Sequence, residues 1–255
     1  MMTTLDPRSS PPVSDFPRFG WPSAVLRHLA PAVLAFAGAL ALKPLVSRLG
    51  LPADFSLDVA FALLLTPVEL SILLVAAHRA TGRWSLRALP AVLAYRRPLR
   101  RWVLLVPPLF AVALIAAVTS GPLTDALAAH CAGLYPHWLL PSYDATSGFS
   151  RPVLVATMLV ALAVDGVTNP IVEELYFRAY LLPRLPVAGW TAVPVSAALF
   201  TVQHYWQPWN WPLIFVLELI LTTLVVRLRS YRLGMVMHVL ANSFGILVTL
   251  VGVLN

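Results

Sequence analysis

The sequence predicts an all-α protein, a polytopic membrane bundle of about seven (seven to eight) transmembrane helices around a cytoplasm-facing polar cavity. The composition is the first reason, because 59% of the 255 residues are hydrophobic and 11% are charged, whereas soluble domains carry about a quarter charged residues. The second reason is a series of apolar stretches of about 20 residues, the length that crosses a bilayer as a helix. The third is a set of charges inside these stretches, which must face protein or water rather than lipid.

Seven stretches reach this length. They cover residues 24–46, 57–78, 102–120, 152–182, 190–206, 210–228 and 233–253. Apolar residues alternate with arginine over 84–100, a pattern that would suit an eighth, interfacial helix. We expect residues 1–22, which are polar and rich in proline, to form a disordered cytoplasmic tail. Residues 23–150 should hold the N-terminal transmembrane helices with a basic cytoplasmic loop, and 151–255 a C-terminal core.

The distribution of arginine predicts the orientation. Residues 78–102 carry seven arginines and no acid, so this loop and the N-terminus should be cytoplasmic. The loop 121–151 holds Asp125 and Asp144 against Arg151 at its end, which fits the outside. The net charge of +7 therefore indicates topology and contact with anionic lipid rather than nucleic-acid binding. Together with the bias toward Ala, Leu, Arg and Pro, this predicts a multi-pass protein of the bacterial inner (plasma) membrane.

The stretch NPIVEELYFRAYLL, residues 169–182, places three charges inside an apolar run. Glu174 and Arg178 are four residues apart with the acid first, the better orientation for an ion pair on a helix. Glu173 projects about 100° away, which leaves its carboxylate available as a general base. Pro170 lacks an amide donor and should kink the helix, admitting water. A packing ion pair is the alternative reading, although it does not require a second acid.

Two other spans carry polar residues at helical spacing. The stretch FTVQH puts Phe200 and His204 on one face, and HVLAN puts His238 and Asn242 on one face. Each histidine alone would more often be a hydrogen-bonded packing residue. At about 1.5 Å per residue from the cytoplasmic turns, however, these residues and Glu173 can meet at similar depth. The three stretches therefore predict one site.

A glutamate with two histidines and an asparagine suits hydrolysis by activated water. Glu173 can take the proton of a water that His204 orients, while His238 and Asn242 can donate hydrogen bonds to an oxyanion. A second mechanism stays open, in which Glu173, His204 and His238 hold zinc or another divalent metal with water in the fourth position. The single cysteine, Cys131, excludes a thiolate cluster.

The three stretches resemble the motifs of the CPBP family of intramembrane endopeptidases, which includes type II CAAX prenyl proteases and Abi-like bacterial proteins. That family shows EExxxR, FxxxH and HxxxN or HxxxD in this order on separate membrane helices. Here EELYFR stands at 173–178, FTVQH at 200–204 and HVLAN at 238–242. Where the family usually has glycine after the arginine, this chain has Ala179. The resemblance covers about the C-terminal 100 residues and makes 151–255 a protease-like catalytic core.

The resemblance implies a role for each matching residue. Glu173 would activate the hydrolytic water, and His204 would share that water or a metal. His238 and Asn242 would bind the oxyanion or complete the metal site. The supporting residues would be Glu174, Arg178 and Phe200. The implied activity is that of a membrane-embedded peptidase, dependent on glutamate or on a metal. Its partners would be a peptide or protein substrate at the membrane, which can be lipidated, and the lipid bilayer, with no nucleic acid.

Two other functions compete with the peptidase. A non-catalytic immunity or scaffold protein of the same fold would not need a free Glu173. A small transporter or proton relay also uses Glu and His chains, but the lack of an internal repeat argues against it. For the isolated acids Glu69 and Glu218 we favour packing or interface roles over pairing with an arginine or lining the cavity. The uncharged turn 206–211, with three tryptophans, should anchor the outer membrane interface.

Overall fold

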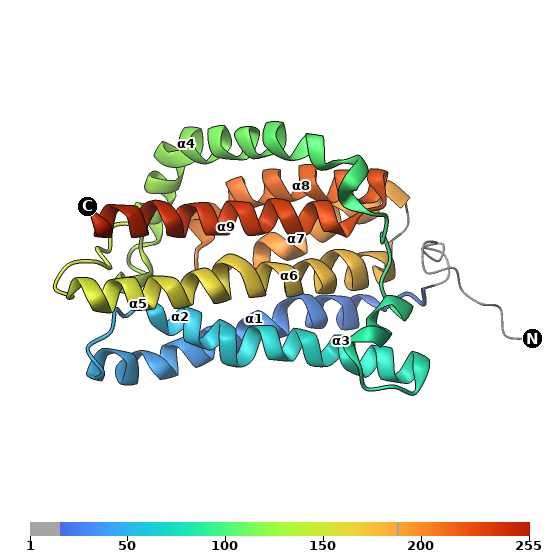
Figure 1. Ribbon diagram of the computed structural model, residues 1–255, viewed down its shortest axis with the longest axis horizontal. Helices are drawn as coiled ribbons and strands as arrows, with labels where there is room; N and C mark the ends of the chain where they lie inside the picture. Colours follow the sequence, from blue (N-terminus) through green and yellow to red (C-terminus); the bar gives the residue numbers. More distant parts are fainter. Residues whose placement is uncertain (1–15, 188) are drawn as a thin grey trace, which may run out of the picture.

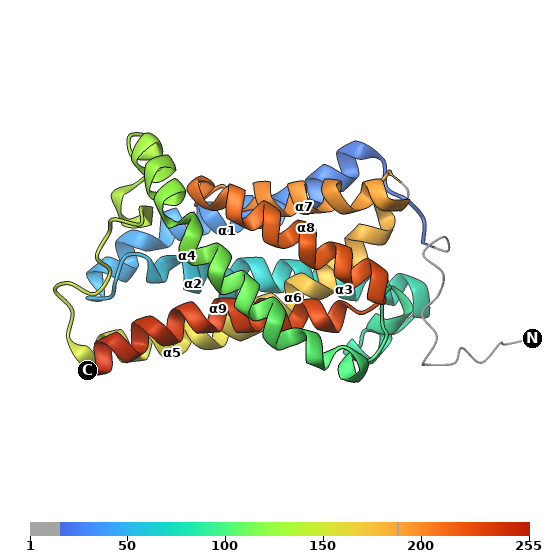
Figure 2. The same cartoon turned by 90° about the horizontal axis from the view of Figure 1, so that it is seen from above.

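The computed structural model describes residues 16–187 and 189–255 as a bundle of roughly aligned helices (Figures 1 and 2). Apart from one isolated bridge between Arg96 and Ser230, the regular structure of these residues is helical. Six helical stretches are long and apolar enough to cross a membrane: Trp21–Arg48, Phe55–Thr81, Val103–Cys131, Arg151–Arg184, Pro208–Leu228 and Tyr231–Leu254. The predicted all-α membrane bundle is confirmed.

The first half of the chain forms α1 (Trp21–Arg48), α2 (Phe55–Ala60), α3 (Thr66–Thr81) and α4 (Val106–Cys131). The second half forms α5 (Arg151–Ala161), α6 (Asn169–Glu173), α7 (Ala192–Gln203), α8 (Trp211–Leu228) and α9 (Tyr231–Leu254). Two of these spans contain π-helical turns, Phe61–Leu65 between α2 and α3, and Leu162–Thr168 and Glu174–Leu181 on either side of α6. Such turns frequently occur at functional sites.

The expected span 190–206 is a much shorter helix. α7 has 12 residues, which at 1.5 Å per residue gives about 18 Å, against about 30 Å of hydrocarbon. It packs against α8 and ends inside the molecule, where Tyr135 donates a hydrogen bond of 2.8 Å to the carbonyl of Tyr205. The count of seven spans is therefore not confirmed. Because α7 is short, His204, its C-terminal cap, lies within the bundle.

The turn after α7 is covered by protein. Trp206 is 7% and Trp209 3% exposed, and their rings contact Phe61 and Tyr135. The segment following α4 packs over this turn, so these two tryptophans are core residues and not the interfacial anchors that the sequence suggested. An uncharged turn looks the same in sequence whether lipid headgroups or other loops cover it.

Two further segments near one end of the bundle differ from expectation. Phe16 is buried, and the amide of Phe19 donates to the carbonyl of Arg184 at 2.8 Å. Residues 16–20 therefore contact the bundle just before α1, which begins at Trp21. The tail prediction for 1–15 lies outside the described residues. The segment 84–100 forms short 3-10 turns rather than a continuous interfacial helix.

Pro170 interrupts the helix Arg151–Arg184 in a specific way. A proline cannot donate to the carbonyl four residues earlier, that of Gly166, nor to the one five residues earlier, that of Asp165, which π-helical turns use. α9 supplies both missing donors. Ser243 Oγ donates to the Gly166 carbonyl at 3.0 Å, and Asn242 Nδ2 donates to the Asp165 carbonyl at 3.1 Å.

We expect Ser243→Ala to lower the free energy of unfolding by about 1 kcal/mol, the typical net value of a hydrogen bond, because the Gly166 carbonyl loses its partner. In a Pro170→Ala background an amide can serve that carbonyl, so the same substitution should cost less. Equilibrium unfolding in detergent of both single variants and the double variant measures this coupling. Equal losses in the two backgrounds would contradict the compensation.

Candidate active site

Arg178 is buried between two carboxylates. It forms ion pairs with Glu174, four residues earlier on its own helix, and with Glu218 of α8, and its guanidinium lies 5.2 Å from the centre of the Phe200 ring. The pair with Glu174 has the predicted spacing. Glu218 is the acid for which the sequence favoured packing, and the structure shows it paired with arginine. The predicted supporting residues Glu174, Arg178 and Phe200 thus lie together.

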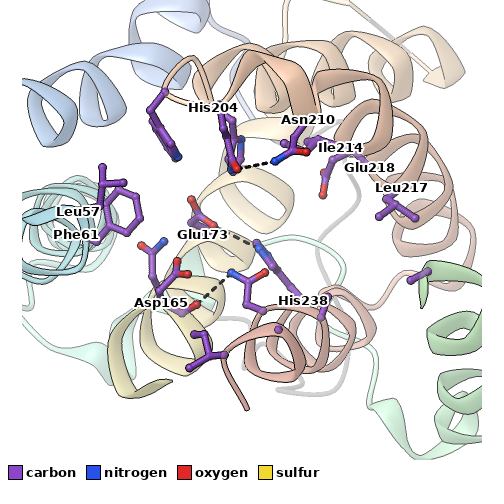
Figure 3. A pocket seen from close by; sticks show the side chains of 18 of the residues that line it. Leu57, Phe61, Asp165, Glu173, His204, Asn210, Ile214, Leu217, Glu218 and His238 are labelled. Atoms are coloured by element: carbon purple, nitrogen blue, oxygen red, sulfur yellow. Dashed lines mark hydrogen bonds and ion pairs between the residues drawn. The ribbon is translucent and has the colours of Figure 1, made fainter. Parts of the chain in front are cut away.

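His238 lies close to both neighbouring glutamates of the motif. Figure 3 shows it beside Glu173. Its Nδ1 is 3.1 Å from Glu174 Oε1, and its Nε2 is 3.7 Å from Glu173 Oε2. If the hydrogen is on Nδ1, it is donated to Glu174, and Nε2 is directed toward Glu173. A separation of 3.7 Å is too long for a direct hydrogen bond and is within the range of an ion pair when the imidazole is protonated.

Glu173 differs from its neighbour in its contacts. No described residue donates a hydrogen bond to its carboxylate, whereas Glu174 is held by Arg178 and His238. The Glu173 side chain is 3% exposed and lines a cavity of about 880 Å³ (Figure 3). The expected division between one supported and one available carboxylate therefore appears in the contacts.

The direction of the cavity is a correction to the sequence prediction. Its walls include Asp54 and Asp58 at the start of α2 and residues 138–141 after α4, while no described residue of the arginine-rich segment 82–102 contributes. The cavity therefore extends toward the end opposite that segment, not toward the predicted cytoplasmic face. Burial raises the pKa of the Asp54 carboxyl at this end.

His204 reaches the same cavity from another helix. Its Nδ1 lies 2.9 Å from the carbonyl of Phe200, and because a carbonyl only accepts, Nδ1 carries the hydrogen. In the neutral ring Nε2 then presents a lone pair, which suits a nitrogen that accepts from water or binds a metal. In the view of Figure 3, Glu173 lies between His204 and His238, and all three side chains line the cavity.

Asn242 lines the cavity as well, but part of its hydrogen-bonding capacity is used. Its amide nitrogen donates to the carbonyl of Asp165, which ties α9 to the interrupted helix. One amide hydrogen remains, so the residue combines a structural contact with a place at the site. The sequence predicted that Asn242 lies at the site but did not predict its hydrogen bond to the Asp165 carbonyl.

Asn169 was missed by the sequence analysis. It is 3% exposed, lines the cavity, and its Oδ1 accepts a hydrogen bond of 3.0 Å from Thr66 Oγ1. That bond leaves the two amide hydrogens without a described acceptor. Asn169 precedes Glu173 by four residues on α6, so the two side chains share a helix face. This spacing is the signal that could have found it.

Glu69 of α3 is a second buried acid close to Glu173. It is fully buried, neither of its carboxylate oxygens has a hydrogen-bond partner among the described residues, and it interacts electrostatically with Glu173. Glu69 forms no ion pair with a described arginine. It is instead buried in the core.

Gly234 of α9 lets Glu174 approach. A Cβ at this position would lie 2.1 Å from Glu174 Oε2 and 2.9 Å from Glu174 Cδ, so a side chain here would displace the carboxylate. We expect Gly234→Ala to loosen the contacts of Glu174 with Arg178 and His238 and to lower the thermal unfolding midpoint by several degrees. Gly245→Ala on the same helix, with nothing within 4 Å of its Cβ, is the matched control. Equal midpoints for the two variants would contradict the close approach.

A metal site would need at least three ligand side chains gathered around one point. In the part of the chain that the structure describes, no three His, Cys, Asp or Glu side chains are grouped so that they could hold a metal ion. As placed, Glu173, His204 and His238 thus do not form a ready ligand set.

The residues that form this geometry coincide with a known family domain. Residues 155–244 match the family model described as type II CAAX prenyl endopeptidase Rce1-like. Over these residues the chain is similar to that family. The match contains all three motifs and confirms the resemblance drawn from them, so the Rce1-like segment indicates a CAAX-type intramembrane endopeptidase in general. With the six apolar helices, it also indicates an integral membrane protein. Comparison with curated proteins and with solved structures finds no match.

Proposed function

We propose that this protein is an intramembrane endopeptidase that hydrolyses a peptide bond of a membrane-associated or lipidated peptide, with Glu173 as general base. The observation that carries the proposal is the asymmetry of the two adjacent glutamates. Glu174 is neutralised by Arg178, while Glu173 lines the cavity without a hydrogen bond from any described residue. A purely structural ion pair would not need the second carboxylate.

In this mechanism Glu173 takes a proton from the attacking water and later delivers it to the leaving amine. His204, with its Nδ1–H held by the Phe200 carbonyl, accepts from that water through Nε2 and orients it. His238 lies 3.1 Å from Glu174 and 3.7 Å from Glu173. In its protonated form it carries a hydrogen on each ring nitrogen, so it donates to Glu174 and stabilises the charge of Glu173. Arg178 holds Glu174, which in turn fixes the orientation of the His238 ring.

Asn169 is the amide that we propose as oxyanion donor, in addition to Asn242. Its orientation is fixed by Thr66, and its amide hydrogens have no described acceptor. We expect Asn169→Ala to lower kcat by about 10²- to 10³-fold, the usual loss for one oxyanion-hole donor, with a smaller effect on KM. Steady-state kinetics on a cleaved peptide measure this. Thr66→Val, which frees the amide to rotate, should give a lesser loss. An unchanged kcat in Asn169→Ala would contradict this role.

The walls of the cavity support a proposal for the route by which a substrate reaches Glu173. Apolar residues of α4, α8 and α9 line its side, and α4 itself buries only Ala128 among its described residues, so it is a peripheral helix beside the site. We propose that the protein lies in the bacterial inner membrane with its N-terminus in the cytoplasm. A peptide then reaches Glu173 from the outer end or from the bilayer beside α4.

The part played by a metal is decided by metal analysis of the purified protein. One equivalent of zinc that disappears in His204→Ala, together with inhibition by chelators, would favour the metal-assisted form of the proposal. Full activity after exhaustive chelation would favour water activated by Glu173 and His204 alone.

The function is tested by comparing peptide termini in membranes. Cells producing the wild-type protein and cells producing His204→Ala are fractionated, and new N-termini of membrane-associated peptides are identified by mass spectrometry. We expect a defined set of termini that requires the intact site. Identical sets from the two strains would refute the proposed peptidase.

A further inference from the structure

A second cavity lies away from the candidate active site, between α1 and α3. Its volume is about 1540 Å³. α1 packs against α2 and against the π-helical residues Phe61–Leu65, whereas it diverges from α3 (Figure 2). The cavity forms a groove between these helices that reaches the end of the bundle where the arginine-rich segment lies, because Pro90, Val92 and Arg96 also line it.

The groove is apolar along the helices and basic at the end near the arginine-rich segment. Along α1 it is lined by Leu26, Ala30, Pro31 and Leu34, and along α3 by Pro67, Val68, Ile72, Val75 and Ala76. Four arginines are also part of the lining: Arg27, Arg79, Arg96 and Arg184. No acidic side chain lies among the described residues that line it. Arg27 is near the start of α1 and Arg79 near the end of α3, which the antiparallel course of the two helices brings to the same end.

Aromatic rings hold two of these arginines in place. The Arg27 guanidinium lies 4.8 Å from the Phe19 ring centre and donates to Ser23 Oγ at 2.9 Å. The Arg184 guanidinium lies 4.3 Å from the ring of Phe16 and 4.2 Å from that of Tyr180. Such preorganised guanidinium groups recognise phosphate well, because little side-chain freedom is lost on binding.

We propose that this groove binds an anionic phospholipid of the surrounding bilayer. The phosphate lies among the arginines, and one acyl chain runs between α1 and α3. From Arg79 to Pro67 the groove follows α3 for twelve residues, about 18 Å at 1.5 Å per residue, a length that suits an acyl chain. Ser71 is the one uncharged polar side chain of α3 in the lining, so a peptide backbone would find few hydrogen-bond partners there.

The charge arrangement favours a lipid over other apolar occupants. Anionic headgroups gather at the cytoplasmic surface, where each nearby lysine or arginine contributes to attraction. The basic end of the groove is the end that the arginine distribution predicts to be cytoplasmic. A neutral lipid would satisfy the apolar walls but would bring no negative charge to Arg27 and Arg79.

The test uses the full chain, purified in detergent and titrated with phosphatidylglycerol or with phosphatidylcholine of the same acyl chains, with bound lipid counted by native mass spectrometry. We expect phosphatidylglycerol to bind more tightly. The double variant Arg27→Gln/Arg79→Gln should bind it about 25-fold more weakly, at about fivefold per arginine. The matched control is Arg83→Gln/Arg87→Gln, which removes two exposed arginines of the same end that do not line the groove.

A variant that fills the groove tests the role of its apolar part independently of the arginines. Ser71→Trp keeps all four arginines, fills the space beside α3, and should reduce phosphatidylglycerol binding while the elution profile stays that of the folded protein. Equal affinity of the wild-type protein for the two lipids would overturn the proposal. So would equal losses in the groove and control double variants, or undiminished binding in Ser71→Trp.

Discussion

Glu173→Gln is expected to reduce the rate of peptide cleavage by about 10²- to 10⁴-fold, the usual contribution of general acid–base catalysis. Glutamine keeps the size of the side chain and removes the carboxylate that takes the proton. The folded state should persist, because no described residue hydrogen-bonds this carboxylate and its nearest charged partner, His238, is 3.7 Å away. Steady-state kinetics and a thermal unfolding midpoint are to be measured on the same preparation.

The control for this substitution is Asp125→Asn, which neutralises an exposed acid on α4 and should leave the rate unchanged. A Glu173→Gln protein that cleaves at the wild-type rate would exclude the general base proposed here. Loss of activity accompanied by a large fall in the unfolding midpoint would assign Glu173 a structural role instead.

Arg178→Met is expected to destabilise the protein by about 3 to 5 kcal/mol, the cost of leaving buried charges without their partner. Arg178 is 1% exposed and pairs with Glu174 and Glu218 at once, so its removal leaves two carboxylates facing each other in the core. Arg178→Lys should also be destabilising, because an ammonium group cannot reproduce the planar fork that spans both acids. Equilibrium unfolding in detergent measures both variants.

A triple variant distinguishes stability from function. Replacing Arg178 by methionine and both Glu174 and Glu218 by leucine removes all three charges together, and such apolar replacements of buried ion networks are often neutral or stabilising. We expect the triple variant to regain much of the lost stability while remaining inactive, because His238 has lost the carboxylate that positions it. A triple variant with full activity would contradict the supporting role of the network.

Much of this arrangement follows from local sequence patterns. The pairing of Glu174 with Arg178 depends on a spacing of four residues on one helix, and the meeting of Glu173 with His238 depends on helix rise and apolar span length. Both are short-range properties that periodicity reports directly. The spans themselves are visible because a bilayer requires long apolar runs.

Contacts between distant segments could not be predicted in this way. Glu218 reaches Arg178 from 40 residues away, and no periodicity relates the two positions. Asn242 and Ser243 serve the carbonyls that Pro170 leaves free, a compensation that depends on how α9 crosses the interrupted helix. The direction of the cavity depends on which loops fold over the helix ends, a property of tertiary packing.

The length of α7 illustrates the same limit. The stretch 190–206 is apolar enough to suggest a span, but the helix ends at Gln203, and residues following α4 cover the turn after it. Apolar composition reports that a segment avoids water, and it does not distinguish burial in lipid from burial in protein. The short helix is nonetheless what brings His204 to the depth of Glu173.

The most direct test of the central claim is a product analysis with the purified wild-type protein in lipid vesicles. A peptide identified from the membrane comparison is added, and the products are weighed by mass spectrometry. Hydrolysis predicts two fragments whose masses sum to that of the substrate plus one water, with the new ends at one peptide bond. A substrate that stays intact, or that changes mass in any other way, would contradict a peptidase that acts through Glu173-activated water.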